Sequence, residues 1–362
     1  MPATIRRGPA LTDVDWPIRL GPLESFPETG LSSALERRWL HYAFMSRDNE
    51  LGMVANIAWL GQEPDLPQPS VRNTSILTVY RRGEGWRSSQ FNCQTFLPLW
   101  SAFRQPHTFA DPQPFHLAST TGTPFVQLTL QRSCRPATGQ CALFAGESPT
   151  DLQHIRWQPE PGIIARGDWG VDGRVYRDVE AVGYQERARG RWGWQHLGGW
   201  VWGFVNDPTE GEPGAPPPTS VVFGLIQPAQ PPDAAAGSIM LWRNGRMRRC
   251  FPRRRVSLAV RGQLDRDHVV QVPEMANLFN VPAMQPIPRR LMVVGRLGDD
   301  WISLDFLCEE ATRVVVPNEI GLHPFSVHEV VGRCQIEGQY NGQRLEFETY
   351  GIVEFAGGAG GD

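Results

Sequence analysis

The sequence predicts an all-β protein, and three observations support this prediction. Short runs rich in β-branched and aromatic residues recur along the chain, glycine and proline fill the gaps between them, and the 3.6-residue periodicity of amphipathic helices is almost absent. Many short strands separated by such turns are typical of sandwiches and barrels. At 362 residues the chain exceeds the usual size of a single core, so two domains are expected.

The first part of the chain is expected to begin with one long hairpin. Residues 37–61 contain two strand-like runs on either side of a turn at residues 47–50. Alternation along the first run places four residues on one face: Trp39, His41, Ala43 and Met45. Shorter strands are then expected at residues 75–81, 91–96, 125–131, 141–144 and 154–157.

Residues 174–207 hold the densest mixture of aromatic, ionisable and glycine residues, and they are expected to form a β-hairpin. Residues 175–186 would form its first strand, residues 190–199 its turn and residues 199–205 its return strand. The period of two places Tyr184, Glu186 and Ala188 on one face of the first strand, and Trp200, Trp202 and Phe204 on one face of the second. The hairpin would then set a carboxylate beside an aromatic wall, as a pocket for a large apolar ligand requires. The alternative is that the tryptophans belong only to the core.

Residues 206–220 are polar and rich in proline, and they predict a boundary between two domains. The expected division is a first domain over residues 1–207, a linker over residues 208–220 and a second domain over residues 221–362. Strands in the second domain are expected at residues 221–227, 239–243, 255–260, 291–296, 301–307, 312–316, 329–337 and 344–355. The last two should form a hairpin, because Asn341-Gly342 is a strong turn signal. A helical turn or two is expected only at residues 274–279.

Composition excludes several kinds of chemistry. All 35 basic residues are arginine, so Schiff-base catalysis, pyridoxal phosphate enzymes and a Walker A loop are excluded, because each requires a lysine. The eight histidines are dispersed and form no metal-binding motif, and no GxSxG is present, so neither a metal site nor a hydrolase triad is predicted. The glycines of residues 190–199 precede no helix that could receive a pyrophosphate, which argues against a dinucleotide cofactor.

Charge and hydropathy bound the partners and the compartment. A net charge of −3 gives no reason to expect nucleic-acid binding, and the basic run at residues 246–255 is expected to be a solvated strand edge. No apolar run is long enough to cross a bilayer, and the N-terminal residues lack the apolar core of a signal peptide. Six scattered cysteines without a CxxC pair fit reduced thiols. We therefore expect a cytoplasmic protein without membrane insertion.

Two motifs in the middle of the chain carry a resemblance to a known superfamily. The runs GYQERARG at residues 183–190 and GWVWG at residues 199–203 resemble the signature of the lipocalin-like superfamily that contains carotenoid 1,2-hydratase, tocopherol cyclase and the fungal decalin-forming Diels–Alderases. The run ERRWLHYAF at residues 36–44 is similar to their opening strand, and residues 329–357 are similar to their closing strands. The resemblance implies two tandem lipocalin-like β-barrel or sandwich domains with a ligand pocket in or between them.

The resemblance also implies an enzyme that needs no cofactor and acts on a hydrophobic small molecule. Its first implication is a cyclase of natural-product biosynthesis that folds a polyene or polyketide-like substrate for an intramolecular [4+2] ring closure. Glu186 and Tyr184 would be its catalytic residues. The implied substrate-binding residues are Trp200, Trp202, Gln185, Arg187, His196 and Trp39.

Two alternatives remain open from the residues. One is hydration or proton-initiated cyclisation of an isoprenoid with Glu186 as the acid, and the other is a carrier of a hydrophobic ligand without catalysis. Where the hydratases have histidine and tryptophan after the acid, this chain has Arg187 and Arg189, and nearby guanidinium groups favour an ionised carboxylate. This order is closer to the Diels–Alderase pattern, although alternation should point Arg187 away from Glu186.

Overall fold

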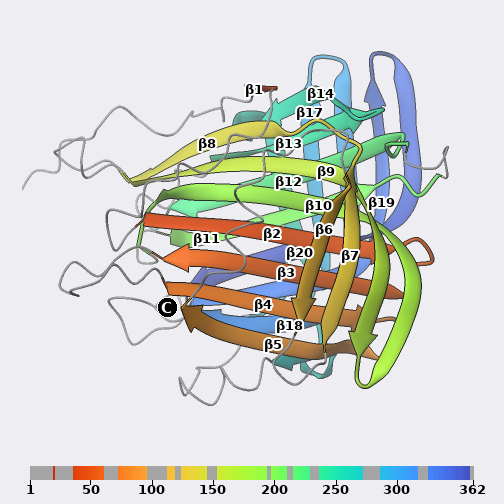
Figure 1. Ribbon diagram of the computed structural model, residues 1–362. Coiled ribbons are helices and arrows are strands. Elements are labelled where there is room, and N and C mark those ends of the chain that lie inside the picture. Colours follow the sequence, from red (N-terminus) through yellow and green to blue (C-terminus); the bar gives the residue numbers. More distant parts are fainter. Residues whose placement is uncertain are drawn as a thin grey trace, which may run out of the picture.

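A computed structural model of the chain describes residues 19–20, 36–60, 72–95, 112–118, 124–144, 153–193, 197–209, 215–228, 236–271, 286–316 and 325–358. These residues form two sheets of ten strands each, which lie one in front of the other in Figure 1. Helical structure among the described residues is limited to two short 3-10 helices, η4 (Arg253–Arg255) and η5 (Arg266–His268). The prediction of an all-β protein is confirmed. The single helical segment expected from the sequence, residues 274–279, lies outside the described residues.

The first sheet contains the strands of the N-terminal half of the chain, all paired antiparallel. Their order is β1-β8-β9-β10-β2-β3-β4-β5; in addition, β7 pairs with β9, and β6 pairs with β7. Its strands are β1 (Arg19–Leu20), β2 (Glu36–Ser46), β3 (Leu51–Leu60), β4 (Arg72–Arg81), β5 (Gly85–Thr95), β6 (Gln113–Ala118), β7 (Phe125–Arg132), β8 (Ala137–Phe144), β9 (Gln153–Val171) and β10 (Arg174–Arg191). The expected hairpin of β2 and β3 is confirmed.

Strand β9 is far longer than the short strand expected at residues 154–157. It continues through Pro159 and Pro161, beyond the end of the expected strand. Along one side β9 pairs with β8 up to Trp157 and with β7 from Ile163, so residues 158–161 pair only with β10 and residue 162 falls at a bulge. The two prolines lie in this gap, where a missing N–H costs no bond to an outer strand.

The second sheet has the order β14-β13-β12-β11-β20-β19-β18-β17-β15, with β16 parallel to β18. Its strands are β11 (Leu197–Asn206), β12 (Thr219–Pro228), β13 (Ala236–Arg243), β14 (Arg246–Pro252), β15 (Val256–Arg261), β16 (Val269–Gln271), β17 (Arg290–Leu297), β18 (Asp300–Val316), β19 (Phe325–Tyr340) and β20 (Gln343–Gly358). The predicted strands 301–307 and 312–316 are one strand, β18, with a bulge between Cys308 and Glu310. Residues 246–252 of the basic run form β14 at the edge of the sheet, as expected, and residues 253–255 form η4.

The hairpin expected over residues 174–207 does not form. β10 pairs with β9 and β2 in the first sheet, whereas β11 pairs with β12 and β20 in the second. Alternation identifies each strand and its two faces, but long-range pairing decides which strands become neighbours. The chain therefore changes sheet between Arg191 and Leu197, ahead of the proline-rich residues 208–220. The division of the chain into two domains at those residues stays a prediction.

The closing hairpin of β19 and β20 is confirmed. Its two turn residues have positive φ, 48° at Asn341 and 74° at Gly342, as a two-residue hairpin turn requires. Among the described strands, no pairing closes either sheet into a barrel, because the strands at the ends of each order have one partner each.

Three apolar clusters fill the molecule, one within each sheet and one between the sheets. Strand β2 shows how alternation divides them, since Leu40, Tyr42 and Phe44 belong to the cluster within the first sheet and Ala43 and Met45 to the other face. We call the cluster on that other face the interface cluster, because it joins residues of both sheets, among them Ala43, Met45, Trp157, Tyr184, Trp202, Phe204, Met240 and Phe325. The face predicted for the opening strand is thus the one that meets the second sheet.

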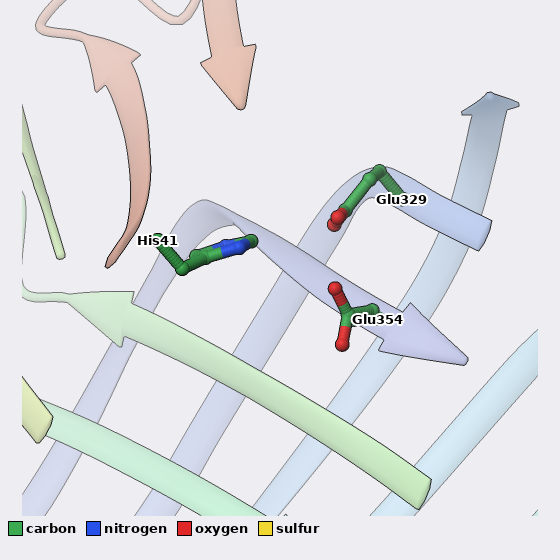
Figure 2. Close-up of side chains that lie close together, drawn as sticks. All are labelled: His41, Glu329 and Glu354. Atoms are coloured by element: carbon green, nitrogen blue, oxygen red, sulfur yellow. The ribbon is translucent and has the colours of Figure 1, made fainter. Parts of the chain in front are cut away.

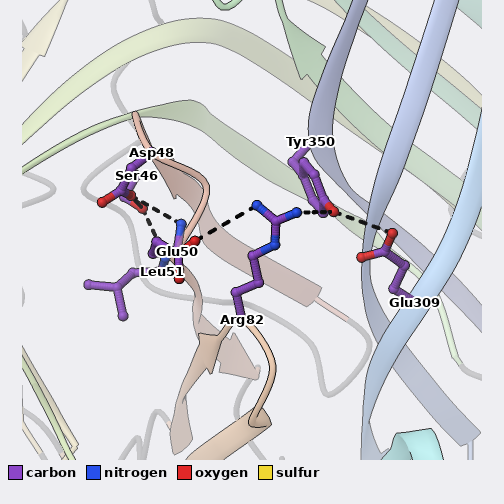
Figure 3. A network of polar contacts seen from close by, with 7 residues as sticks. All are labelled: Ser46, Asp48, Glu50, Leu51, Arg82, Glu309 and Tyr350. Atoms are coloured by element: carbon purple, nitrogen blue, oxygen red, sulfur yellow. Dashed lines mark hydrogen bonds and ion pairs between the residues drawn. The ribbon is translucent and has the colours of Figure 1, made fainter.

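The two sheets also meet through polar contacts at the turns (Figure 3). The guanidinium of Arg82 donates to the hydroxyl of Tyr350 on β20 at 3.2 Å and lies 3.8 Å from the carboxylate of Glu50. The Tyr350 hydroxyl in turn donates to Glu309 at 3.3 Å. Arg82 therefore connects the β2–β3 turn to the second sheet.

No helix among the described residues is long and apolar enough to span a bilayer.

Candidate functional site

The carboxylate of Glu186 lies between the sheets and accepts hydrogen bonds from three side chains. The indole N–H of Trp39 donates to Oε1 at 2.6 Å. The hydroxyl of Tyr184 donates to Oε2 at 2.6 Å, and the indole N–H of Trp157 donates to the same oxygen. Only 8% of Glu186 is exposed. The carboxylate is thus held in one orientation by donors from three adjacent strands, β2, β9 and β10.

Strand register explains why two indoles reach one carboxylate. Trp39 on β2 and Trp157 on β9 both lie directly opposite Ala188 of β10, one on each side. Glu186 is two residues before Ala188 and shares its face, so each indole reaches it along a diagonal. The small side chain of Ala188 leaves room for both rings. Gly224 of β12 makes room from the other sheet, because a Cβ there would lie 3.0 Å from the Trp157 ring.

An aromatic wall from β11 packs against this face of β10. The ring centroids of Tyr184 and Trp202 are 4.6 Å apart, and those of Tyr184 and Phe204 are 5.5 Å apart with the planes nearly parallel. The Trp202 indole donates to the Tyr184 hydroxyl at 3.2 Å, as does that of Trp157 at 3.0 Å. The expected carboxylate beside an aromatic wall is present. It arises from the packing of two sheets rather than from pairing within a hairpin.

Burial dominates the protonation of Glu186. It raises the pKa of the carboxyl to about 7, although the hydrogen bonds from Tyr184, Trp39 and Trp157 act in the opposite direction. The nearby carboxyl of Glu354 adds to the rise in pKa. Near neutral pH the group therefore exchanges between its acid and its carboxylate, which suits proton transfer.

Arg187 and Gln185 lie on the opposite face of β10, among the residues within the first sheet. Arg187 is 3% exposed, and its Nε and Nη2 have no hydrogen-bond partner. Burial lowers the pKa of Arg187 to about 10, and Tyr42, whose side chain also points into the first sheet, acts in the opposite direction. The structure does not bring Arg187 or Gln185 together with Glu186, so the guanidinium that argued for an ionised carboxylate is directed away from it. Their predicted role in substrate binding stays a prediction.

The remaining predicted residues, Trp200, His196 and Trp39, differ in how the structure places them. Trp200 is half-buried on the same interface, where its indole N–H donates to the carboxylate of Glu354 and its ring lies 5.2 Å from that of Phe325. His196 lies outside the described residues. Trp39, expected only to contact the substrate, instead contacts the predicted catalytic carboxylate directly.

A second polar group lies on the interface and was not predicted. A ring nitrogen of His41 and one oxygen each of Glu329 and Glu354 lie within 4.8 Å of one another, and all three residues are buried (Figure 2). The ring of His41 packs edge-on against Trp202 at 4.9 Å. Burial lowers the pKa of His41 to about 3, so the imidazole is neutral, and burial raises the pKa of Glu329 well above its usual range.

Sequence reasoning also missed Trp157, because its strand was expected to end there and no local pattern gives its partner. A signal for the acid pair did exist. In the hairpin predicted from Asn341-Gly342, counting back from the turn sets Glu329 directly opposite Glu354. His41 had been assigned to the same face as Trp39, which is the face that meets them.

Comparison with known proteins supports the fold. No protein family and no curated protein matches the sequence. A candidate AttH from Nitrosomonas europaea has a similar structure, with a TM-score of 0.53 and 13% identity over 93% of this chain and 99% of that one. Kievitone hydratase from Nectria haematococca has a TM-score of 0.53 and 10% identity over 93% of each chain. CghA, solved with Sch210972, has a TM-score of 0.48 and 10% identity over 94% of this chain and 98% of that one. The first two share the fold of this chain along nearly its whole length.

Proposed function

We propose that this chain, which has the fold of the lipocalin-like superfamily of carotenoid 1,2-hydratase, tocopherol cyclase and decalin-forming Diels–Alderases, is an enzyme that uses Glu186 as a general acid. Its substrate is a hydrophobic natural product with a carbon–carbon double bond. Glu186 transfers its proton to one carbon of that bond, and the cation on the other carbon is captured by water or by a second double bond of the same molecule. The products are those of hydration or of proton-initiated cyclisation.

The observation that carries this proposal is the set of donors around Glu186. When the acid gives up its proton, negative charge develops on both oxygens, which already face the N–H of Trp39, the N–H of Trp157 and the O–H of Tyr184. Donors that are in place before the reaction stabilise such charge without reorganisation. Oε1 accepts one hydrogen bond from the described residues, which leaves it a lone pair for the proton.

The aromatic wall suits the cation that protonation creates. Faces of tryptophan and tyrosine attract a cation by about 0.5–2 kcal/mol each, more when water is excluded. Tyr184 and Trp202 present such rings beside the acid. In hydration, the oxygen of water bonds to the cationic carbon, and one proton of that water is transferred to Glu186. In cyclisation, a carbon next to the new cation loses a proton, which is likewise transferred to Glu186. The acid is regenerated in both cases.

A second candidate is the cofactor-independent [4+2] ring closure, and the stacking of Trp202 and Phe204 on Tyr184 favours it. A rigid aromatic surface can hold a polyene folded, and positioning of this kind supplies up to about 7–11 kcal/mol of the barrier. Protonated Glu186 would then donate a hydrogen bond to a carbonyl of the substrate rather than a proton to carbon. No atom is added and the product keeps the substrate mass.

Turnover in deuterium oxide separates the two candidates. Suitable probes are kievitone, because a protein of the same fold is a kievitone hydratase, and neurosporene, because the resemblance includes carotenoid hydratases. Under the acid mechanism the product carries deuterium on carbon, hydration adds the mass of one water, and Glu186→Gln abolishes turnover. Glu180→Gln is the matched control, since Glu180 lies on the same strand but is only half-buried and is paired with Arg166. A product without carbon-bound deuterium, formed by Glu186→Gln at a substantial rate, would overturn the acid mechanism.

A further inference from the structure

Two buried acids face each other across the closing hairpin of the second sheet. Glu329 of β19 and Glu354 of β20 are paired directly in the strand register, and they are 4% and 8% exposed. Like charges directly opposite on adjacent strands destabilise a sheet, and burial increases the penalty. A pair of this kind needs a cation or a proton between its members. The hydrogen bonds that hold Glu186 do not involve Glu329 or Glu354, so they do not account for the burial of this acid pair.

His41 of the first sheet is directed at this pair (Figure 2). It is 2% exposed, and a nitrogen of its ring lies within 4.8 Å of an oxygen of each acid. Asn56 contacts Nδ1 at 3.5 Å, and Nε2 has no hydrogen-bond partner. Oε2 of Glu329 also has none. A buried polar atom left without a partner costs about 1–3 kcal/mol. Two such atoms, one from each sheet, therefore lie at the same place and are available to bind a ligand.

We propose that His41, Glu329 and Glu354 bind a divalent transition-metal ion of the Zn²⁺ type that cross-links the two sheets. The charge of two carboxylates matches that of the ion, and imidazole nitrogen with carboxylate oxygen is a ligand set that such ions accept. Metal–ligand distances of about 2.0–2.2 Å require the three ligand atoms to approach to roughly 3–3.5 Å, which rotations of the two long glutamate side chains allow. A water molecule completes a four-coordinate site.

The surroundings of the three ligands fit this role. The imidazole of His41 is neutral because burial lowers its pKa to about 3, so its lone pair is available at neutral pH. The Trp200 indole donates to Glu354 and Asn56 contacts Nδ1 of His41, which are the outer contacts that orient metal ligands. The competing occupant is a proton shared by the two acids, because burial raises the pKa of both Glu329 and Glu354.

Metal binding is tested on the full chain after chelation. Addition of Zn²⁺ should give one bound ion per chain by elemental analysis, and Co²⁺ should give visible absorption bands of a low-coordinate site. His41→Asn, Glu329→Gln and Glu354→Gln should each weaken binding by more than about 100-fold, beyond the usual loss for an outer contact, and Trp200→Phe by about tenfold. His328→Asn is the control, because His328 is also buried and also has an unpartnered Nε2 but alternates to the other face of β19.

A measurement on the unaltered protein guards against variants that fail to fold. Binding to the folded state raises the melting temperature with ion concentration, so Zn²⁺ should raise it relative to the chelated protein. Unchanged affinity in His41→Asn would place the ion elsewhere and overturn the proposal. Absence of stoichiometric binding, with an infrared carboxylic acid band that both glutamine variants lose, would show a shared proton instead. The role of Glu186 is tested separately, by carbon-bound deuterium in the product, and its partners Trp39, Trp157 and Tyr184 are not ligands of the proposed ion.

Discussion

The indole N–H of Trp39 on β2 donates to Oε1 of Glu186 on the neighbouring strand β10, at 2.6 Å. Trp39 supplies the single donor to this oxygen among the described residues, whereas Oε2 has two. Its contribution to the protonation of Glu186 is therefore separable from that of the other donors.

Trp39→Phe should raise the pKa of Glu186 further above 7. The substitution keeps an aromatic ring but removes a hydrogen bond that favours the ionised form, and a bond to a charged group contributes about 1.5–3 kcal/mol, or about one to two pH units. Titration of the carboxyl by infrared difference spectroscopy against Glu186→Gln measures the change. Trp301→Phe is the control and should leave the titration unaltered, because Trp301 is a half-buried residue at the start of β18 in the second sheet. A lower pKa in Trp39→Phe would contradict the assigned direction of this bond.

The stability of the fold should fall as the pH rises from about 4.5 to about 7. The folded state raises the pKa of Glu186 from 4.5 to about 7, so it binds this proton more tightly than the unfolded chain does. The resulting contribution is fully present below pH 4.5, is lost as the pH rises through about 7, and amounts to about 3 kcal/mol. Urea unfolding at several pH values, with chelator present, should show a smaller decrease for Glu186→Gln than for the parent. The stability of Glu180→Gln should decrease over this range as that of the parent does, because the hydrogen bond from Arg166 lowers the pKa of the half-buried Glu180 rather than raising it.

Under the acid mechanism, kcat should fall as the pH rises through about 7. Only the protonated form of Glu186 donates, and its fraction decreases tenfold per pH unit above its pKa. Steady-state rates from pH 5 to 9 with a turned-over probe measure this limb. A rate that stays level across this range, with a product of unchanged mass, favours the cycloaddition instead.

Tyr184→Phe should destabilise the fold by about 1–3 kcal/mol. The hydroxyl accepts from Trp157 and Trp202 and donates to Glu186, so its loss leaves the buried N–H of Trp202 without its partner. Chemical denaturation measures the difference. Tyr176→Phe is a matched control, because the Tyr176 hydroxyl is buried without a hydrogen-bond partner and its removal should not destabilise the fold. Equal effects of the two substitutions would show that the Tyr184 hydroxyl contributes nothing to stability.

Faces of strands could be predicted from the sequence, and partners of strands could not. Alternation alone assigned Tyr184 and Glu186 to one face and Trp202 and Phe204 to another, and both assignments hold in the interface cluster. The prediction that β10 and β11 form one hairpin was wrong, because each strand pairs with strands far away in the sequence. Local pattern carries no information on that choice.

The same limit explains which site residues were missed. Trp157 reaches Glu186 only because β9 pairs with β10, a register set by many contacts along both strands. Glu329 and Glu354 could have been paired from the Asn341-Gly342 turn, since a two-residue turn fixes the register of its hairpin. Their meeting with His41 depends on how the two sheets pack, which no single strand encodes.

The acid and the wall come from different parts of the chain. Glu186 and its three hydrogen-bond partners all precede the crossing after Arg191, whereas Trp202 and Phe204 follow it. Under the proposed mechanism, the group that donates the proton and the surface that shapes the substrate would therefore lie on separate stretches of sequence. Substitutions confined to β11 and its neighbours would then alter the shape of the accepted molecule and leave the acid and its three donors unchanged.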